Sequence, residues 1–228
     1  MRLMQRLPRE TGRDYALRVI KDNIIRLELA PGSFISENEL ASELGLSRTP
    51  VREALIELSR AKVVEISPQK RSVVAPIDER LVEEARFSRD VLECSVVQLV
   101  CQMATEQDLA KLQENVHLQE YYKANGQISQ IMDLDNQLHK ALFLIAEKSQ
   151  VYELVQSMAI HFDRIRSIAL NDIRDLDIVS DHRAIVDAIC ARDPQEASQV
   201  MKLHLNRCGV DAAAIREKYP QYFVQNNQ

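Results

Sequence analysis

The stretch Glu37–Leu58, ENELASELGLSRTPVREALIEL, decides the fold of the first part of this chain. Ser36 stands three residues before Glu39, which is the spacing of a capping box and predicts the start of a helix. Gly45 suits the left-handed residue that ends such a helix, and Ser47 can cap the next one. The sequence therefore predicts two helices joined by a tight turn.

The second of these helices is expected to have one apolar and one basic face. The apolar stripe consists of Val51, Ala54, Leu55 and Leu58. Arg48 and Arg52 are four residues apart and share the opposite face, next to Ser47 and Thr49. Arginine can bind guanine through two parallel hydrogen bonds, and serine and threonine hydroxyls can reach phosphates. The pattern favours a helix that reads the major groove of DNA, and the alternative is a solvated basic face.

Two runs rich in β-forming residues, VVEIS and SVVA, flank the polar turn PQKR and predict a hairpin. Lys70 and Arg71 lie at its tip, where they can touch a groove or the DNA backbone. A further helical pattern covers Asp14 to Leu29. A helix, a helix-turn-helix and a hairpin together predict a winged helix.

These motifs resemble the DNA-binding domain of GntR-type transcriptional regulators, most closely in the run LGLSRTPVREAL. The resemblance implies that Ser47, Arg48, Thr49 and Arg52 contact the operator, with the wing at Lys70 and Arg71. The chain departs from the family at two positions. Many members have arginine where this chain has Asn38, and many have glycine at the wing tip where it has Arg71.

The rest of the chain reads as helix throughout. Helical patterns are expected at about 79–103, 106–124, 127–147, 150–171, 179–191 and 194–217. The first 76 residues carry 13 Lys and Arg against 10 Asp and Glu, whereas the remainder carries 16 against 24. This change of charge favours two domains with different partners. We expect a mainly α protein, with a winged helix-turn-helix in residues 1–76 and an all-α helical bundle in 77–228.

Histidine placement is the most informative feature of the second part. Asp135 and His139 are one helical turn apart, and His182 and His204 lie in later helices. Three imidazoles and a carboxylate suit Zn²⁺, Ni²⁺, Mn²⁺ or Fe²⁺. By spacing alone, ordinary core or surface histidines are the alternative. His117 and His161 carry no such pattern and are expected to be ordinary.

The region 79–217 resembles the helical effector domain of the FadR branch of GntR regulators, the FCD domain. The matching pieces are FSRDVLE, DLDNQLHKAL, DHRAIVDAI and KLHL. This resemblance implies a divalent transition metal held by Asp135, His139, His182 and His204. It also implies that Arg89 pairs with the carboxylate of an effector such as a sugar acid, a hydroxy acid or a dicarboxylate. The alternative is a surface salt bridge between Arg89 and a nearby Glu.

The sequence is thus expected to encode a regulator, either a repressor or an activator, that binds a near-palindromic double-stranded operator as a homodimer. A metalloregulator that responds to the ion itself is the main alternative, and an architectural DNA-binding protein is another. An enzyme is not expected, because no general base stands beside the candidate ligands.

The longest apolar run, ALFLIA at Ala141–Ala146, is too short to span a membrane. Cys94, Cys101, Cys190 and Cys208 lack C-x-x-C pairing, so we expect reduced thiols in a cytoplasmic protein.

Overall fold

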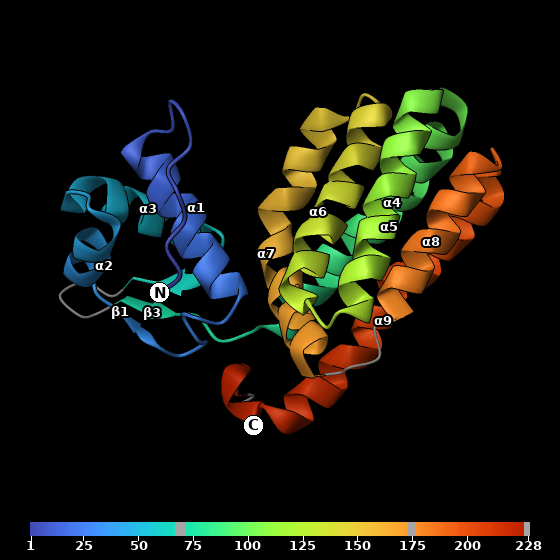
Figure 1. Cartoon of the computed structure of the whole chain (residues 1–228). Coiled ribbons are helices and arrows are strands. Elements are labelled where there is room, and N and C mark those ends of the chain that lie inside the picture. Colours follow the sequence, from blue (N-terminus) through green and yellow to red (C-terminus); the bar gives the residue numbers. More distant parts are fainter. Residues whose placement is uncertain (67–71, 173–176, 226–228) are drawn as a thin grey trace. The chain divides into compact units, whose positions relative to one another are not determined.

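The computed structural model describes residues 1–66, 72–172 and 177–225, and they form two compact units (Figure 1). The first unit comprises Met1–Val82, Ile160–Ser167 and Ala214–Gln228. The second comprises Glu83–Ala159 and Ile168–Ala213. The predicted mainly α architecture, with a winged helix-turn-helix and a helical bundle, is confirmed.

The first unit is built around the predicted helix-turn-helix. Its helices are α1 (Gly12–Ile25), α2 (Glu37–Leu44) and α3 (Arg48–Arg60), and both α1 and α2 pack on α3. Helix α1 ends earlier than the pattern predicted, since Leu27 adopts a φ of 62° beyond its last turn. Its buried face includes Val19, Ile20 and the polar Asn23.

A three-stranded antiparallel sheet completes this unit, with the strands in the order β1-β3-β2. The predicted hairpin is formed by β2 (Val64–Glu65) and β3 (Ser72–Val74), in which Val64 pairs with Val74. The third strand, β1 (Phe34–Ile35), was not predicted. It is only two residues long, too short to show alternation, and its pairing with β3 fixes it.

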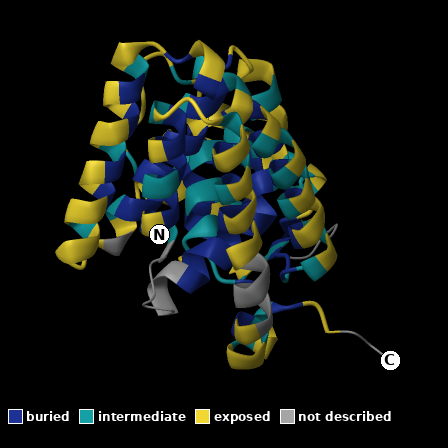
Figure 2. Ribbon diagram, turned by 90° about the vertical axis from the view of Figure 1, so that its right-hand side faces the viewer, coloured by how far each residue is buried: buried dark blue, intermediate teal, exposed yellow. Residues whose placement is uncertain are grey.

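The second unit consists of helices that match the predicted ranges to within a few residues. They are α4 (Glu79–Met103), α5 (Glu106–Ala124), α6 (Ile128–Ile145), α7 (Ser149–Asp172), α8 (Asp177–Cys190) and α9 (Pro194–Lys218), and a short 3-10 helix, η1 (Pro220–Tyr222), follows. Parts of α4, α7 and α9 and the whole of η1 belong to the first unit. Exposed residues follow the outer faces of the helices, and buried residues lie between them (Figure 2).

Helix caps explain why two of these helices begin where they do. Thr105 and Asp108 form a reciprocal capping box at the start of α5. Asp193 caps α9, because its Oδ1 accepts the backbone N–H groups of Gln195 and Glu196, each at 3.0 Å. The start of α9 at Pro194 is therefore fixed by the residue directly before it.

No helix among the described residues is long and apolar enough to cross a membrane. Cys94, Cys101 and Cys190 are free thiols, and the side chain of Cys208 lies outside the described part.

Candidate metal centre and nucleic-acid interface

The turn between α2 and α3 has the geometry that the sequence predicts. The Ser36 side chain accepts the backbone N–H of Glu39 at the start of α2. Gly45 ends this helix in the left-handed conformation, with a φ of 64°. Ser47 then occupies the N-cap position of α3, but within the described chain its side chain makes no capping hydrogen bond. The prediction that the Ser47 side chain caps α3 is therefore wrong, and this side chain is exposed.

The two faces of α3 differ as expected. The apolar side chains are buried, namely Val51, Ala54, Leu55 and Leu58. Ser47, Arg48, Thr49 and Arg52 are all exposed. A guanidinium nitrogen of Arg48 lies 3.5 Å from a Glu37 carboxylate oxygen, a surface contact that contributes little to stability. The first turn of α3 thus presents two arginines and two hydroxyls to solvent.

The predicted wing tip, Lys70 and Arg71, lies outside the described residues, while the strands on either side of it are in place. Asn38, where many family members have arginine, is exposed in the first turn of α2.

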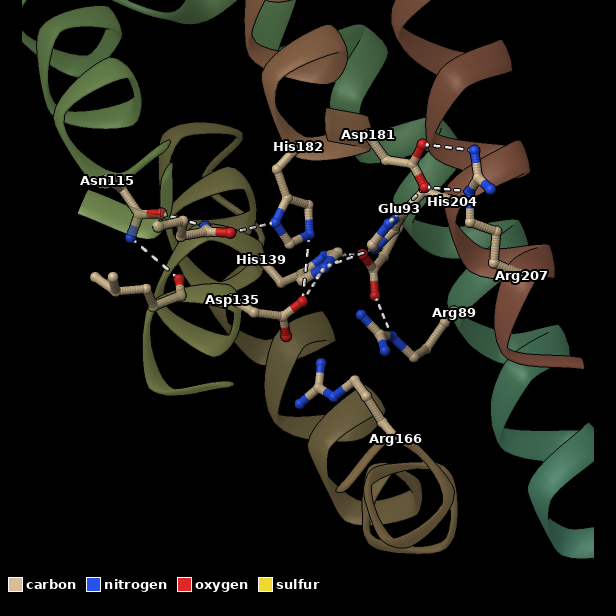
Figure 3. Close-up of polar contacts among 12 residues, drawn as sticks. Arg89, Glu93, Asn115, Asp135, His139, Arg166, Asp181, His182, His204 and Arg207 are labelled. Carbon is tan, nitrogen blue, oxygen red and sulfur yellow. Dashed lines mark hydrogen bonds and ion pairs between the residues drawn. The ribbon is translucent and has the colours of Figure 1, made fainter. Parts of the chain in front are cut away.

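In the second unit, the four predicted ligands come together. Asp135, His139, His182 and His204 are buried, and one ligand atom from each lies within 4.8 Å of all the others. Asp135 and His139 come from α6, while α8 and α9 supply His182 and His204 (Figure 3). His117 is exposed, and His161 in the first unit contacts the Ala61 carbonyl oxygen at 2.8 Å, so neither is part of this cluster.

The atoms that meet at the centre are mutually repulsive unless a cation or protons lie between them. The Nε2 atoms of His139 and His204 face each other at 3.3 Å. Oδ1 of Asp135 lies 3.2 Å from Nε2 of His182 and 3.7 Å from Nε2 of His139. Imidazole nitrogens with a carboxylate oxygen form a donor set that suits a divalent transition metal.

A second layer of side chains faces the other nitrogen of each imidazole (Figure 3). Nδ1 of His139 contacts the Glu93 carboxylate, and Nδ1 of His182 lies 2.7 Å from Oε1 of Gln119. Nδ1 of His204 lies 3.7 Å from Oδ2 of Asp181. The Glu93 and Gln119 oxygens favour a proton on Nδ1 of His139 and His182 and so leave the Nε2 lone pairs toward the centre.

The orientation of Gln119 is fixed in turn by its neighbours. Its amide nitrogen donates to Oδ1 of Asn115 at 2.8 Å, and the Asn115 amide donates to the Leu134 carbonyl at 3.1 Å. Gln119 therefore presents its oxygen, rather than its nitrogen, to His182. This chain of hydrogen bonds connects α5 with the residue that precedes Asp135.

Burial and neighbouring charges shift the pKa of several of these groups. Burial would lower the pKa of the His139 imidazole, but the Glu93 and Asp135 carboxylates raise it above its usual value. Burial lowers the pKa of His204 to about 3, assisted by His182 and His139 and opposed by Asp181, so its imidazole is neutral. Burial would raise the pKa of the Glu93 carboxyl, but Arg89 and His139 hold it well below its usual range. The Glu93 carboxylate is therefore ionised.

Arg89, the predicted effector-binding residue, is a buried side chain on α4. Its Nε donates to Oε1 of Glu93 at 2.6 Å, one helical turn away. Arg89 is thus connected to His139 through Glu93. The alternative interpretation placed a salt bridge with a nearby Glu at the surface; the structure contains such a pair, but it is buried.

Sequence reasoning missed the residues of the second layer. Glu93, Gln119 and Asp181 are acidic or amide side chains of ordinary appearance in the sequence. The available signals were local: Glu93 lies four residues after Arg89, and Asp181 directly precedes His182. No spacing rule connects Gln119 with a histidine 63 residues later.

A winged helix with an exposed basic reading helix, combined with a helical domain that holds an Asp-His₃ cluster, defines a DNA-binding regulator with a sensor domain. Residues 16–74 match the model of the bacterial regulatory proteins of the gntR family, and residues 84–207 match the FCD domain. The chain belongs to the GntR family of transcriptional regulators, in the FadR branch that carries an FCD domain.

Similar proteins support this assignment over nearly the full length. The HTH-type transcriptional repressor RspR of Escherichia coli (strain K12) is 27% identical over 209 residues, covering 91% of this chain and 92% of RspR. An uncharacterized HTH-type transcriptional regulator in an unstable DNA locus of Streptomyces ambofaciens is 31% identical over 217 residues, covering 95% of this chain and 91% of that protein. These relatives are regulators and not enzymes.

Two solved structures share the fold. McbR/YncC of E. coli superposes with a TM-score of 0.79 at 21% identity, covering 92% of this chain and 99% of that chain. A GntR regulator from Rhodococcus sp. RHA1 gives a TM-score of 0.72 at 22% identity, covering 89% and 97%.

The cluster leads to a prediction about metal content. His182→Ala removes a ligand, so the variant should contain little metal when it is purified without chelators or affinity nickel. Gln119→Ala removes only a second-layer acceptor and should weaken metal affinity by about 10- to 100-fold. Elemental analysis and a competition titration measure both. His117→Ala, an exposed histidine outside the cluster, is the control and should retain full occupancy; full occupancy in His182→Ala would exclude His182 from the site.

Proposed function

We propose that this chain is a ligand-responsive bacterial transcription regulator that acts in the cytoplasm. Residues 1–76 would bind the operator, and residues 77–228 would bind a small carboxylate at a metal site and mediate dimerisation. The observation that carries the DNA-binding part is the exposed group of Ser47, Arg48, Thr49 and Arg52 opposite the buried stripe of α3.

Each residue of this group has a role that follows from its chemistry. Arg48 and Arg52 would contact base edges in the major groove, where a guanidinium can hold guanine by two hydrogen bonds. The hydroxyls of Ser47 and Thr49 would contact phosphates and set the register of the helix. Lys70 and Arg71 of the wing would add contacts to the DNA backbone.

Arg48→Ala and Arg52→Ala should each weaken operator binding by about 1–3 kcal/mol while the Tm stays unchanged. Fluorescence anisotropy would measure this, using a duplex selected from random sequences by the full-length protein. Arg60→Ala is the matched control, because Arg60 is exposed at the opposite end of α3. Unaltered affinity in both reading-helix variants would refute the assignment of α3.

In the sensor domain, Asp135, His139, His182 and His204 would hold Zn²⁺, Ni²⁺, Mn²⁺ or Fe²⁺. Such an ion supplies coordination positions for the oxygens of a sugar acid, hydroxy acid or dicarboxylate. The support is the convergence of four buried donor atoms and the second layer that orients them. Arg89 would supply a buried positive charge for the carboxylate of the effector.

The second candidate is a metalloregulator, and titrations separate the two. Operator affinity would be measured for metal-free protein, for Zn²⁺-loaded protein, and for loaded protein with a panel of carboxylic acids. We expect the ion alone to change the Kd by less than about threefold. One of the acids should release the operator with a coupling of about 1–3 kcal/mol. A full change produced by Zn²⁺ alone would favour the metalloregulator.

We also propose that the protein is a homodimer, so that two reading helices meet a near-palindromic operator. The supporting feature is the exposure of large apolar side chains on two neighbouring helices, namely Phe87 and Val91 of α4 and Leu203 of α9, which are 63%, 50% and 65% exposed. The two helices lie side by side there, because Arg86 contacts Asn206 and Cys94 contacts the Ser198 carbonyl. Large exposed apolar side chains that adjoin one another are typical of an interface.

The double substitution Phe87→Glu/Val91→Glu should shift the protein from dimer to monomer at micromolar concentration, because it places charges in an apolar contact. Light scattering coupled to size exclusion measures the mass. Tyr121→Glu, at another exposed position on α5, should leave the dimer intact. A double variant that stays fully dimeric would move the interface elsewhere.

A further inference from the structure

The N-terminal arm, residues 1–11, is held firmly on α1. The buried side chain of Asn23 accepts the Arg2 backbone N–H at 2.7 Å and donates to the Arg2 carbonyl at 2.9 Å. The Tyr15 hydroxyl donates to the Met4 carbonyl at 2.9 Å, and Arg18 donates to the Gln5 carbonyl at 3.0 Å. The arm runs back along α1 in dark blue (Figure 1). These hydrogen bonds make the arm an integral part of the first unit.

The arm ends in a turn, Leu7–Glu10, with Pro8 and Arg9 in the middle. The backbone N–H of Glu10 donates to the Leu7 carbonyl at 3.2 Å. Arg9, the third residue of the turn, has a φ of 64°. Glycine or asparagine is the usual residue at a turn position with a positive φ. A side chain at such a position carries conformational strain, and strain of this kind concentrates at functional sites.

Both the side-chain carboxylate and the backbone carbonyl of Glu10 accept hydrogen bonds that hold this turn in place. Its carboxylate accepts the Leu7 backbone N–H at 2.9 Å and two donors of Arg18 at 2.7 and 2.8 Å. Arg6 donates to the Glu10 carbonyl at 3.0 and 2.7 Å. Arg6 and Arg18 are thus engaged within the arm. Arg9 is exposed, and no hydrogen bond or ion pair reaches it in the described part of the chain.

The turn lies close to the start of α3. A Cβ placed on Gly12 would be 3.5 Å from side-chain atoms of both Leu46 and Pro50, so the start of α1 lies in van der Waals contact with the start of α3. Leu46 and Pro50 flank the Ser47–Thr49 segment of α3. Arg9 is three residues before Gly12, a Cα separation of at most roughly 11 Å. The major groove is about 12 Å wide, so a group beside the reading helix can reach the phosphates along its edge.

From these observations we propose that Arg9 is a phosphate-contacting residue, held by the Leu7–Glu10 turn so that it binds the DNA backbone beside the half-site. This inference rests on the proposed function, because it needs α3 to enter the groove. Arg9 would add affinity without reading sequence, since phosphate contacts position a protein on DNA.

Two substitutions in the full-length protein, Arg9→Gly and Arg9→Lys, separate the loss of a phosphate contact from the relief of backbone strain at Arg9. Arg9→Gly removes the charge but suits the positive φ, so its Tm should be equal or higher. Its affinity should fall by about three- to tenfold for both a selected operator and a random duplex of equal length. The slope of log K against log salt should become shallower by about 0.9 for each reading head. Arg9→Lys retains the charge and should bind within about twofold of the unmodified protein.

Arg60→Ala again serves as the control, since it removes one exposed charge from the same unit. Arg9→Gly that matches this control in affinity and salt slope would overturn the proposal. Equal losses in Arg9→Gly and Arg9→Lys with a lower Tm would also overturn it and assign Arg9 to arm stability. Failure of Arg48→Ala to weaken binding, when the unmodified protein binds, would instead contradict the proposed function.

Discussion

The helical unit depends on hydrogen bonds that fix which nitrogen of His139 and of His182 faces the centre. Glu93 and Gln119 accept from two of the histidines, and Asp181 faces the third. Together with the ligands, these residues tie α4, α5, α6, α8 and α9 to a single point. A buried polar group without a partner is costly, so this arrangement is favourable only when every member is satisfied. The facing Nε2 atoms of His139 and His204 are the part that a bound cation would complete.

In the first unit, by contrast, the charged side chains of the candidate site are exposed and not buried. Its apolar side chains lie inside and its charged groups face outward on the same short helix, so folding itself determines which residues can meet DNA. The N-terminal arm shows the same division. The buried Asn23 and the partly buried Arg18 hold the arm in place by hydrogen bonds, while the arginines of the arm lie at the surface. The first unit thereby exposes arginines on both the arm and α3 in a chain whose net charge is −5.

Much of this fold can be predicted from the sequence, because helix periodicity and caps such as Thr105 and Asp193 are local signals. The Asp135 and His139 pair is local as well, whereas the convergence of His182 and His204 was available only through the family resemblance. The second layer escaped prediction, because an acceptor such as Gln119 acts through tertiary position. The β1 strand escaped for a related reason, since Ile35 pairs with Ser72, which lies 37 residues further along the chain. Lys70 and Arg71 stay predictions.

The middle of α7 shows a different limit of sequence reasoning. Residues Ile160–Ser167 group with the first unit, where Ile160 joins the core and His161 bonds to the Ala61 carbonyl. Arg164 is fully buried and donates to the Ala75 carbonyl at 2.7 Å, and burial lowers the pKa of its guanidinium to about 10. Motifs near residue 76 suggest where one pattern stops, but they are silent about a later helix that completes the core. The first unit is therefore built from segments about 100 residues apart in the chain. Its packing depends on residues far beyond the helix-turn-helix.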